Sequence, residues 1–304
     1  MNLSIIIVSW NTRQLLEQCL ASIFAHPPDG DFEVLVVDNH SDDGSAGMVK
    51  ARFPQVQLIE NQANTGFARG NNQAIRRSRG EYILLLNPDT VVKPGALREL
   101  AAYLDEHPTA GAAGPRLFNP DGSLQASCSP APSLSREFLR MFHLPGIRPD
   151  GTYAMDGWDV HTPRNVDILV GACLLLRRSV LDQVGLLDET YFIYSEEVDL
   201  CKRVQQAGWR LVWVPQAQVV HYGGQSTQQV AVEMFLRLYQ SKVIYFRKHH
   251  GWASALAYKL LLIAASMVRI LLTPVAFLQQ PAKRQRHLEL SSHYSRLILT
   301  LPGM

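Results

Sequence analysis

Cysteine is scarce in this sequence, and its few copies are scattered. Cys19, Cys128, Cys173 and Cys201 form no Cys-x-x-Cys pair and have no run of histidines nearby. This spacing excludes the usual zinc-binding patterns and gives no sign of a disulfide framework. We therefore expect a protein of a reducing compartment, the cytoplasm.

An excess of charge of one sign is also missing. The 304 residues include 29 Lys and Arg against 27 Asp and Glu, so bulk charge does not indicate a nucleic-acid partner and we expect none. The opening MNLSIIIVSWN has neither the basic region nor the long apolar stretch of a secretory signal. We expect that the catalytic part is not exported.

Short apolar runs rich in β-branched residues recur in the first third of the chain. They occupy residues 3–9, 32–37, 56–59 and 82–86. Such runs, bounded by polar residues, are typical of strands buried on both faces. Amphipathic segments of helix length lie between them, at 12–24 and 94–107. This alternation predicts an α/β fold with a mainly parallel central sheet that is flanked by helices, Rossmann-like in its first half.

The middle of the chain is less regular. Residues 119–165 are rich in Pro, Gly, Ser and Asp, which predicts a long loop over the sheet, a candidate lid. A continuous apolar run follows at 166–178. We then expect a helix near 196–207 and two short strands at 211–214 and 218–222.

Strand patterns end near residue 226, and only helical patterns follow. We therefore expect two domains, a catalytic domain of residues 1–226 and a helical extension of residues 227–304. Within the extension, residues 252–277 are apolar enough to suggest a membrane span, although a lysine, an arginine and a proline interrupt them.

The polar residues of 252–277 fall in one narrow sector of a helix. They are Lys259, Ser266, Arg269 and Thr273. The remaining surface is apolar, and basic clusters flank the segment at 247–250 and 283–287. This pattern is typical of a helix that lies in a membrane interface beside anionic headgroups. A helix packed in a homodimer or against the catalytic domain is the alternative, and a true span is a third interpretation.

Asn87, Pro88 and Asp89 end the apolar run at 82–86. The carboxyl ends of parallel strands open onto the ligand crevice of α/β proteins. A divalent cation on a diphosphate needs only one or two carboxylates from the protein, because phosphate oxygens and water complete its shell. Asp89 could supply one; alternatively, it caps the helix that follows.

Asp38 occupies the same kind of position after the run at 32–37, and a polar loop of residues 39–45 follows it. Helix capping by Ser41 or Asp42 would explain the loop but not Asp38. A second polar stretch, residues 60–80, contains Asn and Gly residues that could approach a base or a sugar, and three arginines that could neutralise phosphates. Its spacing matches neither the Walker nor the dinucleotide motif.

The segment YFIYSEEVDLCKRVQQAGWR predicts a helix with an inward carboxylate. On a helical projection Glu197 lies near the centre of the apolar face, Glu196 at its edge, and Asp199 on the far side, where it would form a surface pair with Arg203. Apolar surroundings raise the basicity of a carboxylate, which suits a general base. The alternative is a structural Glu197 paired with an arginine.

His221 ends the strand pattern AQVVH and precedes two glycines. A neutral imidazole can ligate a metal or bond a phosphate, and a satisfied structural histidine is the alternative.

Seven motifs follow one another along residues 3–226. They are SIIIVSWNT, VVDNHSDDGS, NTGFARGNN, LLLNPDT, GACLLLRR, YFIYSEEVDLCKRVQQAGW and VVHYGGQST. This ordered set resembles the inverting nucleotide-sugar glycosyltransferases of family 2, whose fold is called GT-A. The family usually has an Asp-x-Asp motif where this chain has Asn87 as the first residue, although the branch that resembles bacterial rhamnosyltransferases often has asparagine there.

The resemblance implies a role for each matching residue. The nucleotide-sugar-binding set is Ser9, Asn11, Asp38, Asn64, Gly66, Arg69 and Asn87. Asp89, assisted by His221, would bind Mg²⁺ or Mn²⁺ on the diphosphate, and Glu197 would deprotonate the acceptor hydroxyl. A retaining route would need a second nucleophile, and the sequence offers none.

The implied activity is inverting transfer of a sugar, rhamnose being one candidate, from a dTDP- or UDP-sugar to a cell-surface glycan or a polyprenyl-diphosphate-linked acceptor. The implied location is peripheral, on the inner face of the cell membrane. Two other functions remain open, a nucleotidyltransferase and a catalytically silent nucleotide-sugar-binding scaffold.

Overall fold

The computed structural model describes residues 2–142, 152–225, 227–274 and 281–304, without the side chains of 227, 228, 281–283, 286 and 287. The described residues form two compact units. Unit 1 comprises those of Met1–Ala131, Thr152–Phe192 and Glu196–Gln229, and unit 2 those of Pro132–Gly151, Ile193–Ser195 and Val230–Met304.

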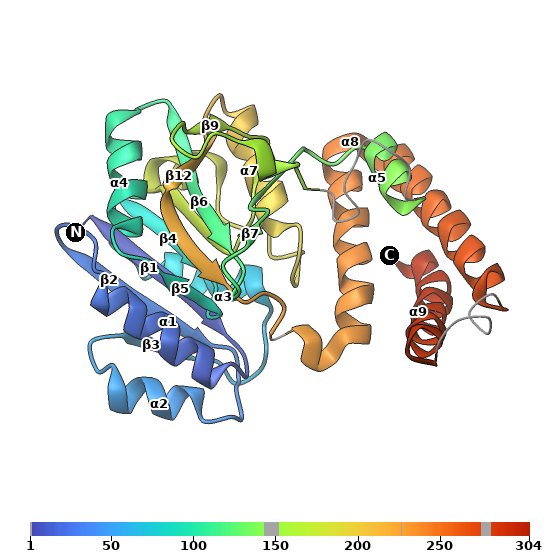
Figure 1. Cartoon of the computed structure of the whole chain (residues 1–304), viewed down its shortest axis with the longest axis horizontal. Helices are drawn as coiled ribbons and strands as arrows, with labels where there is room; N and C mark the ends of the chain where they lie inside the picture. The colour runs from blue at the N-terminus through green and yellow to red at the C-terminus, as the bar shows by residue number, and fades with distance from the viewer. Residues whose placement is uncertain (1, 143–151, 226, 275–280) are drawn as a thin grey trace. The chain divides into compact units, whose positions relative to one another are not determined.

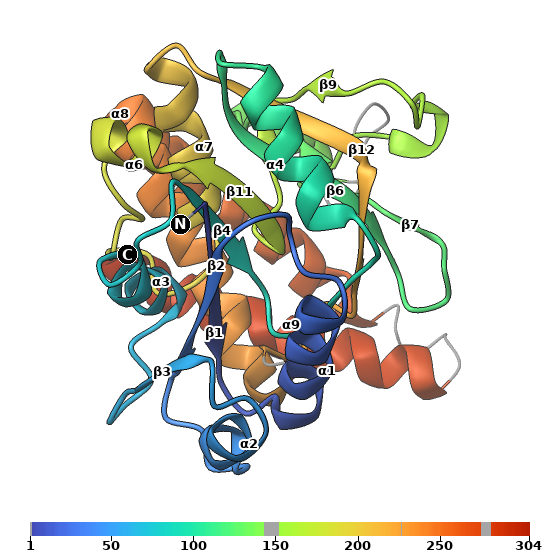
Figure 2. The same ribbon diagram turned by 90° about the vertical axis from the view of Figure 1, so that its left-hand side faces the viewer.

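Unit 1 is built on a sheet whose main path runs β3-β2-β1-β4-β11-β6-β12-β5 (Figures 1 and 2). Its strands are β1 (Leu3–Ser9), β2 (Phe32–Asp38), β3 (Gln57–Glu60), β4 (Tyr82–Leu86), β5 (Thr90–Val92), β6 (Ala110–Phe118), β11 (Cys173–Arg177) and β12 (Arg210–His221). The first four strands of the path are parallel, as are β6 and β12, whereas β11 and β5 run antiparallel to their neighbours. The predicted α/β fold with a mainly parallel sheet is confirmed.

Helices cover both faces of this sheet (Figure 2). One face carries α1 (Arg13–Ala25), α2 (Ser45–Arg52) and α4 (Ala96–Glu106), and the other carries α3 (Phe67–Ile75), α6 (Arg178–Val184) and α7 (Glu196–Gln206). Successive strand residues point to opposite faces, so Ile5 and Ile7 lie in one core while Ile6 and Val8 lie in the other. The sheet is therefore mostly apolar, and many of its polar side chains lie at or near the strand ends.

The region predicted as a long loop, residues 119–165, is more structured than expected. It contains β7 (Leu124–Gln125), β8 (Cys128–Ser129), α5 (Leu134–Met141), the 3₁₀ turn η1 (Met155–Gly157) and β9 (Arg164–Asn165). Residues 143–151 lie outside the described part of the chain. Elements of two or three residues are too short to show a hydrophobic period, so the sequence pattern could not reveal them.

Two further predictions need correction. The apolar run at 166–178 is divided between β10 (Ile168–Leu169), which pairs with β8, and β11. The two strands expected at 211–214 and 218–222 are one strand, β12, with a register shift against β6 between Val214 and Gln218. The polar residues at this bulge interrupt the apolar pattern, so the sequence predicted a loop between two strands.

Unit 2 consists mainly of α8 (Ala231–Leu271), α9 (Pro281–Thr300) and α5, so C-terminal helices are present as predicted. Gly251, with φ 82°, interrupts the helical backbone of α8 and separates it into two halves. Tyr239, Phe246, Tyr258 and Leu297 form the centre of the unit's core. The helix predicted to run to residue 277 ends at Leu271, and residues 275–277 lie outside the described part.

Candidate active site

Ser9 and Asp38 are register partners at the carboxyl ends of β1 and β2. Asp38 is 4% exposed, and its Oδ2 accepts the N–H of Ser41 at 3.0 Å. Its Oδ1 is buried and has no hydrogen-bond partner among the described residues. Leaving a buried carboxylate oxygen without a donor is costly, so Oδ1 is the position where a ligand donor would be expected.

Asn11 connects the end of β1 to the loop after β2. Its backbone has the left-handed φ of 51°. Its N–H donates to Ser41 Oγ at 2.9 Å, and its Oδ1 accepts the N–H of Asp42 at 2.9 Å. The structure therefore brings Asn11 to Asp38, as predicted for residues of one pocket.

Asn39 holds the next predicted loop in place, although its position in the sequence predicted no separate role for it. Its Nδ2 donates to Asn64 Oδ1 and to the carbonyl oxygen of Gly66, each at 3.1 Å, while its Oδ1 accepts from Asn61 and Thr65. Asn39 is 2% exposed. These bonds bring Asn64 and Gly66 to the end of β2.

Gly66 occupies a position that only glycine fits. Its φ is 87°, and a Cβ added there would lie 2.5 Å from the carbonyl oxygen of Phe192. The same carbonyl accepts the N–H of Phe67 at 2.7 Å. The glycine thus allows the start of α3 to close against residue 192.

Arg69, another member of the predicted set, lies on α3 beside Glu189. Its side chain is 61% exposed, and its Nε lies 3.8 Å from Glu189 Oε2. Glu189 also pairs with Arg76 at 3.0 Å. An arginine already associated with a surface carboxylate has less reason to neutralise a phosphate.

A second group of predicted residues converges just after β4, the neighbour of β1, where β5 lies beside β12. Thr90 pairs with His221 there. His221 Nε2 lies 3.4 Å from Asp89 Oδ1 and 3.4 Å from Asn87 Nδ2. Asp89 does not cap a helix, because β5 follows it directly and the N-cap of α4 is Gly95.

Gln125 on β7 (Leu124–Gln125) sets the tautomer of His221. Its Nε2 donates to the backbone oxygen of His221 at 3.0 Å and to Asn119 Oδ1 at 2.8 Å, so its Oε1 is the atom that faces His221 Nδ1 at 2.7 Å. Because an amide oxygen only accepts, Nδ1 carries a proton, and in the neutral imidazole the lone pair is then on Nε2, which faces Asp89 and Asn87. The sequence contained no signal for Gln125, which lies in the region predicted to be a loop.

Asp89 and His221 are suited to share a divalent cation. Within the described residues no group of three or more His, Cys, Asp or Glu side chains could hold a metal. A cation on a diphosphate takes most of its ligands from phosphate and water, so a carboxylate oxygen and an imidazole lone pair facing one point are sufficient. Mn²⁺ accepts both ligand types, and Mg²⁺ prefers the oxygen.

The apolar face predicted for α7 is buried, but the position predicted for Asp199 was wrong. Asp199, expected on the surface, is fully buried, and its Oδ2 accepts from Arg203 Nε at 2.8 Å. Arg203 also donates to the carbonyl oxygens of residues 184, 185 and 186. These bonds compensate the burial of both charges, which a helical projection cannot anticipate because it assigns every acid to water.

Glu196 and Glu197 both bury the Oε2 atom of their carboxyl group, as expected for the inward Glu197. Glu196, predicted at the edge of the apolar face, is 4% exposed, and Glu197, predicted at its centre, is half-buried. Burial, followed by the neighbouring charge of Glu197, raises the pKa of Glu196 well above its ordinary value. The raised pKa favours the protonated, neutral form of Glu196.

Glu197 lies next to the segment that reaches Asn87. A Cβ added at Gly171 would lie 3.3 Å from Glu197 Cγ, and the following residue, Ala172, accepts the N–H of Asn87 at 2.9 Å. The absence of a side chain at Gly171 leaves room for Glu197 at this point. Gly171 and Ala172, two successive residues of the chain, thus link Glu197 to Asn87 and Asp89.

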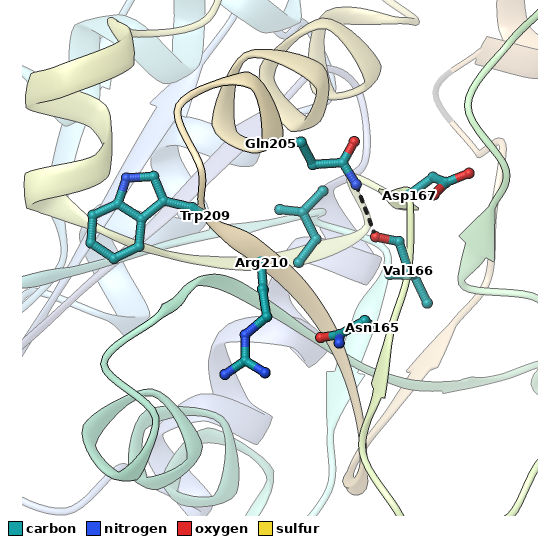
Figure 3. A pocket seen from close by; sticks show the side chains of 7 residues that line it. Asn165, Val166, Asp167, Gln205, Trp209 and Arg210 are labelled. Atoms are coloured by element: carbon teal, nitrogen blue, oxygen red, sulfur yellow. Dashed lines mark hydrogen bonds between the residues drawn. The ribbon is translucent and has the colours of Figure 1, made fainter.

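A surface pocket of about 230 Å³ lies elsewhere in unit 1 (Figure 3). Its lining residues are Asn165, Val166, Asp167, Gln205, Trp209, Arg210 and Leu211. They surround the amino end of β12, whereas His221 lies at its carboxyl end. Gln205 Nε2 donates to the carbonyl oxygen of Val166 at 3.2 Å across this pocket. None of the predicted site residues lines it.

The polar strand ends described above agree with what comparison with known proteins finds. The family model "Glycosyl transferase family 2" matches residues 4–185. The chain belongs to this family. It is a glycosyltransferase by family, with the GT-A fold, and the resemblance stated from the motifs is confirmed.

Two relatives and one solved structure illustrate the likeness. An N-acetylglucosaminyl-diphospho-decaprenol L-rhamnosyltransferase of Mycobacterium tuberculosis is 33% identical over 82% of this chain and 86% of its own. Rhamnosyltransferase WbbL of Escherichia coli K12 is 29% identical over 72% and 82%. The mannosyltransferase PcManGT of Pyrobaculum calidifontis, solved with GDP-Man and Mn²⁺, covers 99% of this chain and 86% of its own at a TM-score of 0.58 and 18% identity, which supports the fold alone.

Proposed function

We propose that this enzyme is an inverting glycosyltransferase that moves a sugar from a dTDP- or UDP-sugar to a hydroxyl of a polyprenyl-diphosphate-linked or cell-surface glycan. The observation that carries the proposal is the convergence of Asn87, Asp89 and His221 beside the strand end, with Nε2 of His221 directed at Asp89 Oδ1. The rhamnosyltransferase relatives make rhamnose the first donor sugar to test.

Donor binding divides between the two groups of residues. Asp38 and Asn11 hold the nucleoside, with the free Oδ1 of Asp38 accepting from a base or a ribose hydroxyl. Ser9, Asn64, Gly66 and Asn87 shape the pocket around the rest of the nucleotide, and Arg69 stands outside it. Asp89 and His221 hold the cation, which when bound would offset the charge of the departing diphosphate.

Glu197 is the general base in this proposal. It accepts the proton of the acceptor hydroxyl while the hydroxyl oxygen forms its bond to the anomeric carbon and the bond to the diphosphate oxygen breaks. The leaving group departs as the nucleoside diphosphate, and attack from the opposite side inverts the anomeric configuration. Glu196 is buried beside Glu197, and its raised pKa disfavours a second negative charge next to the base.

In this proposal the catalytic domain of residues 1–226 carries out the transfer, and the helical region of residues 227–304 positions the enzyme. We place the enzyme on the cytoplasmic side, peripheral to the inner face of the membrane, where a polyprenyl-linked acceptor would be within its reach. The four cysteines are buried thiols, which agrees with a reducing compartment.

A transfer assay tests the proposal. The purified chain, with Mn²⁺, is incubated with dTDP-rhamnose or a UDP-sugar and an N-acetylglucosaminyl-diphospho-polyprenol. A disaccharide-lipid with inverted anomeric configuration by NMR is expected. Pyrophosphate release from a nucleoside triphosphate would instead indicate a nucleotidyltransferase. Donor binding without transfer or hydrolysis, unaffected by Glu197→Gln, would indicate a silent scaffold.

A further inference from the structure

The second half of α8 presents its polar side chains to the interior of unit 2. Ser266 is fully buried, and Lys259 Nζ donates to the carbonyl oxygen of Met304. The guanidinium of Arg269 lies 5.0 Å from the ring of Tyr294, and Thr273 Oγ1 bonds Ser291 Oγ at 2.9 Å. The polar sector predicted from the sequence is therefore occupied by the protein itself.

An adjoining side of the same helix is apolar and exposed. Trp252 is 74% and Leu271 77% exposed, and Leu256, Leu260 and Met267 are exposed between them. At about 100° per residue these five side chains fall within a sector of about 100°. We call them the apolar face of α8. A helix of a soluble protein normally shows the reverse arrangement, with its apolar side inward.

Composition adds the second observation. Between Glu233 and Glu289 the chain has nine lysine and arginine residues and no acidic residue. Arg247 and Lys248 are exposed immediately before Gly251, where the apolar face begins. An apolar face beside a basic stretch of the chain is complementary to an anionic lipid surface.

From these observations we infer that the apolar face of α8 lies on an anionic bilayer, with Trp252 at the headgroup boundary and the basic residues before Gly251 against the headgroups. This inference makes the proposed membrane location more specific. It rests on the proposed function only for the reason why the enzyme would be at a membrane. Trp is a favoured side chain at membrane interfaces. A second copy of the chain is the less suitable occupant, because it would bring two basic segments together.

The arrangement also argues for a helix lying on the bilayer. Of the described helices, α8 is long and apolar enough to cross a membrane by length and composition. In its apolar stretch of 18 residues, 28% is buried within the protein. A span would have to place Lys259 and Arg269 at the level of the acyl chains, where charged groups are costly. A helix on the surface keeps both in their contacts within unit 2.

Vesicle binding tests the inference without any sugar substrate. The full chain is sedimented with phosphatidylcholine vesicles, with and without phosphatidylglycerol, and none contains a polyprenol. Binding is expected only when the vesicles contain phosphatidylglycerol. Added salt should weaken that binding. The triple substitution Leu256→Gln, Leu260→Gln and Leu271→Gln should lower binding at least about tenfold. Phe138→Gln, which alters a similarly exposed side chain on α5, should not.

Further readouts keep the inference falsifiable should the triple variant unfold. The fluorescence of the native chain should shift to the blue with anionic vesicles, and Trp252→Phe should lose that shift. Glu197→Gln should bind vesicles normally, which separates this inference from failure of the proposed chemistry. Unchanged vesicle binding of a folded triple variant would overturn the inference. Resistance of the bound chain to alkaline extraction would also overturn it, because it indicates a membrane span. So would a native dimer that the triple substitution converts to monomers.

Discussion

Asp89 Oδ1 and His221 Nε2 face each other at 3.4 Å, although 131 residues separate them in the chain. The pairing of β5 with β12 brings them together, and Gln125 fixes which imidazole nitrogen is free. Both side chains are largely buried, and their closeness is what the proposed cation site requires.

Replacing Gln125 tests the role of the tautomer. Gln125→Leu removes the acceptor for Nδ1–H, so His221 no longer presents Nε2 reliably, and the Mn²⁺ concentration for half-maximal activity should rise about 10- to 100-fold. Activity at saturating Mn²⁺ should fall much less. The exposed Gln216 offers a control, Gln216→Leu, which should leave the Mn²⁺ titration unchanged. Equal titrations for both variants would remove Gln125 from the site.

The two adjacent glutamates should respond differently to the same substitution. Glu197→Gln removes the proposed base and should lower the rate of transfer at least about 100-fold with little change in donor binding. Glu196→Gln resembles the neutral acid that burial already favours, so activity should stay within a few fold of the native enzyme. Initial rates with the lipid-linked acceptor check both, and the opposite order of effects would assign the base to Glu196.

Glu196 should also make stability fall as pH rises. Because its pKa is raised in the folded chain, the folded state binds more protons than the unfolded state above about pH 4.3, the ordinary value for glutamate. Ionisation therefore costs stability from that pH upward, until the raised pKa is passed. The increase in melting temperature produced by Glu196→Gln should be larger at pH 8 than at pH 4. Exposed Glu106→Gln should show no such difference, and an equal response would contradict the burial argument.

Two glycines provide a matched pair for the donor pocket. Gly66→Ala places a Cβ 2.5 Å from the carbonyl oxygen of Phe192 at a φ of 87°, so it should destabilise the chain by at least about 2 kcal/mol and weaken donor binding. Gly47, inside α2, has nothing within 4 Å of the added Cβ. Gly47→Ala should be neutral or stabilising by about 0.5–1 kcal/mol. Thermal unfolding distinguishes them, and a harmless Gly66→Ala would mean that the loop opens freely.

Much of the first half of this fold could be predicted from the sequence, because short apolar runs rich in β-branched residues occur mainly in strands buried on both faces. Asp38 and Asp89 were found for the same reason, as polar side chains directly after such runs. The positions of Glu196 and Asp199 could not be predicted, since a helical projection shows which residues share a face but not which contacts satisfy a buried charge.

Gln125 and the polar side of α8 illustrate a second limit. A two-residue strand has no periodicity. The place of Gln125 in the sheet could therefore be recognised only from the pairing of β7 with β6 in the structure. The clustering of Lys259, Ser266 and Arg269 was readable from spacing. That the cluster faces the interior follows from its contacts with Met304, Met141 and Tyr294, which are far away in sequence or on another helix.

Donor titration tests the central claim most directly. The purified chain is titrated by calorimetry with dTDP-rhamnose and with UDP-sugars, in Mn²⁺ and in chelator, alongside Asp89→Asn. We predict that one donor binds in Mn²⁺, that chelator weakens its binding at least about tenfold, and that Asp89→Asn does the same in Mn²⁺. Donor binding of equal strength in chelator and in Asp89→Asn would contradict a cation site at Asp89 and His221.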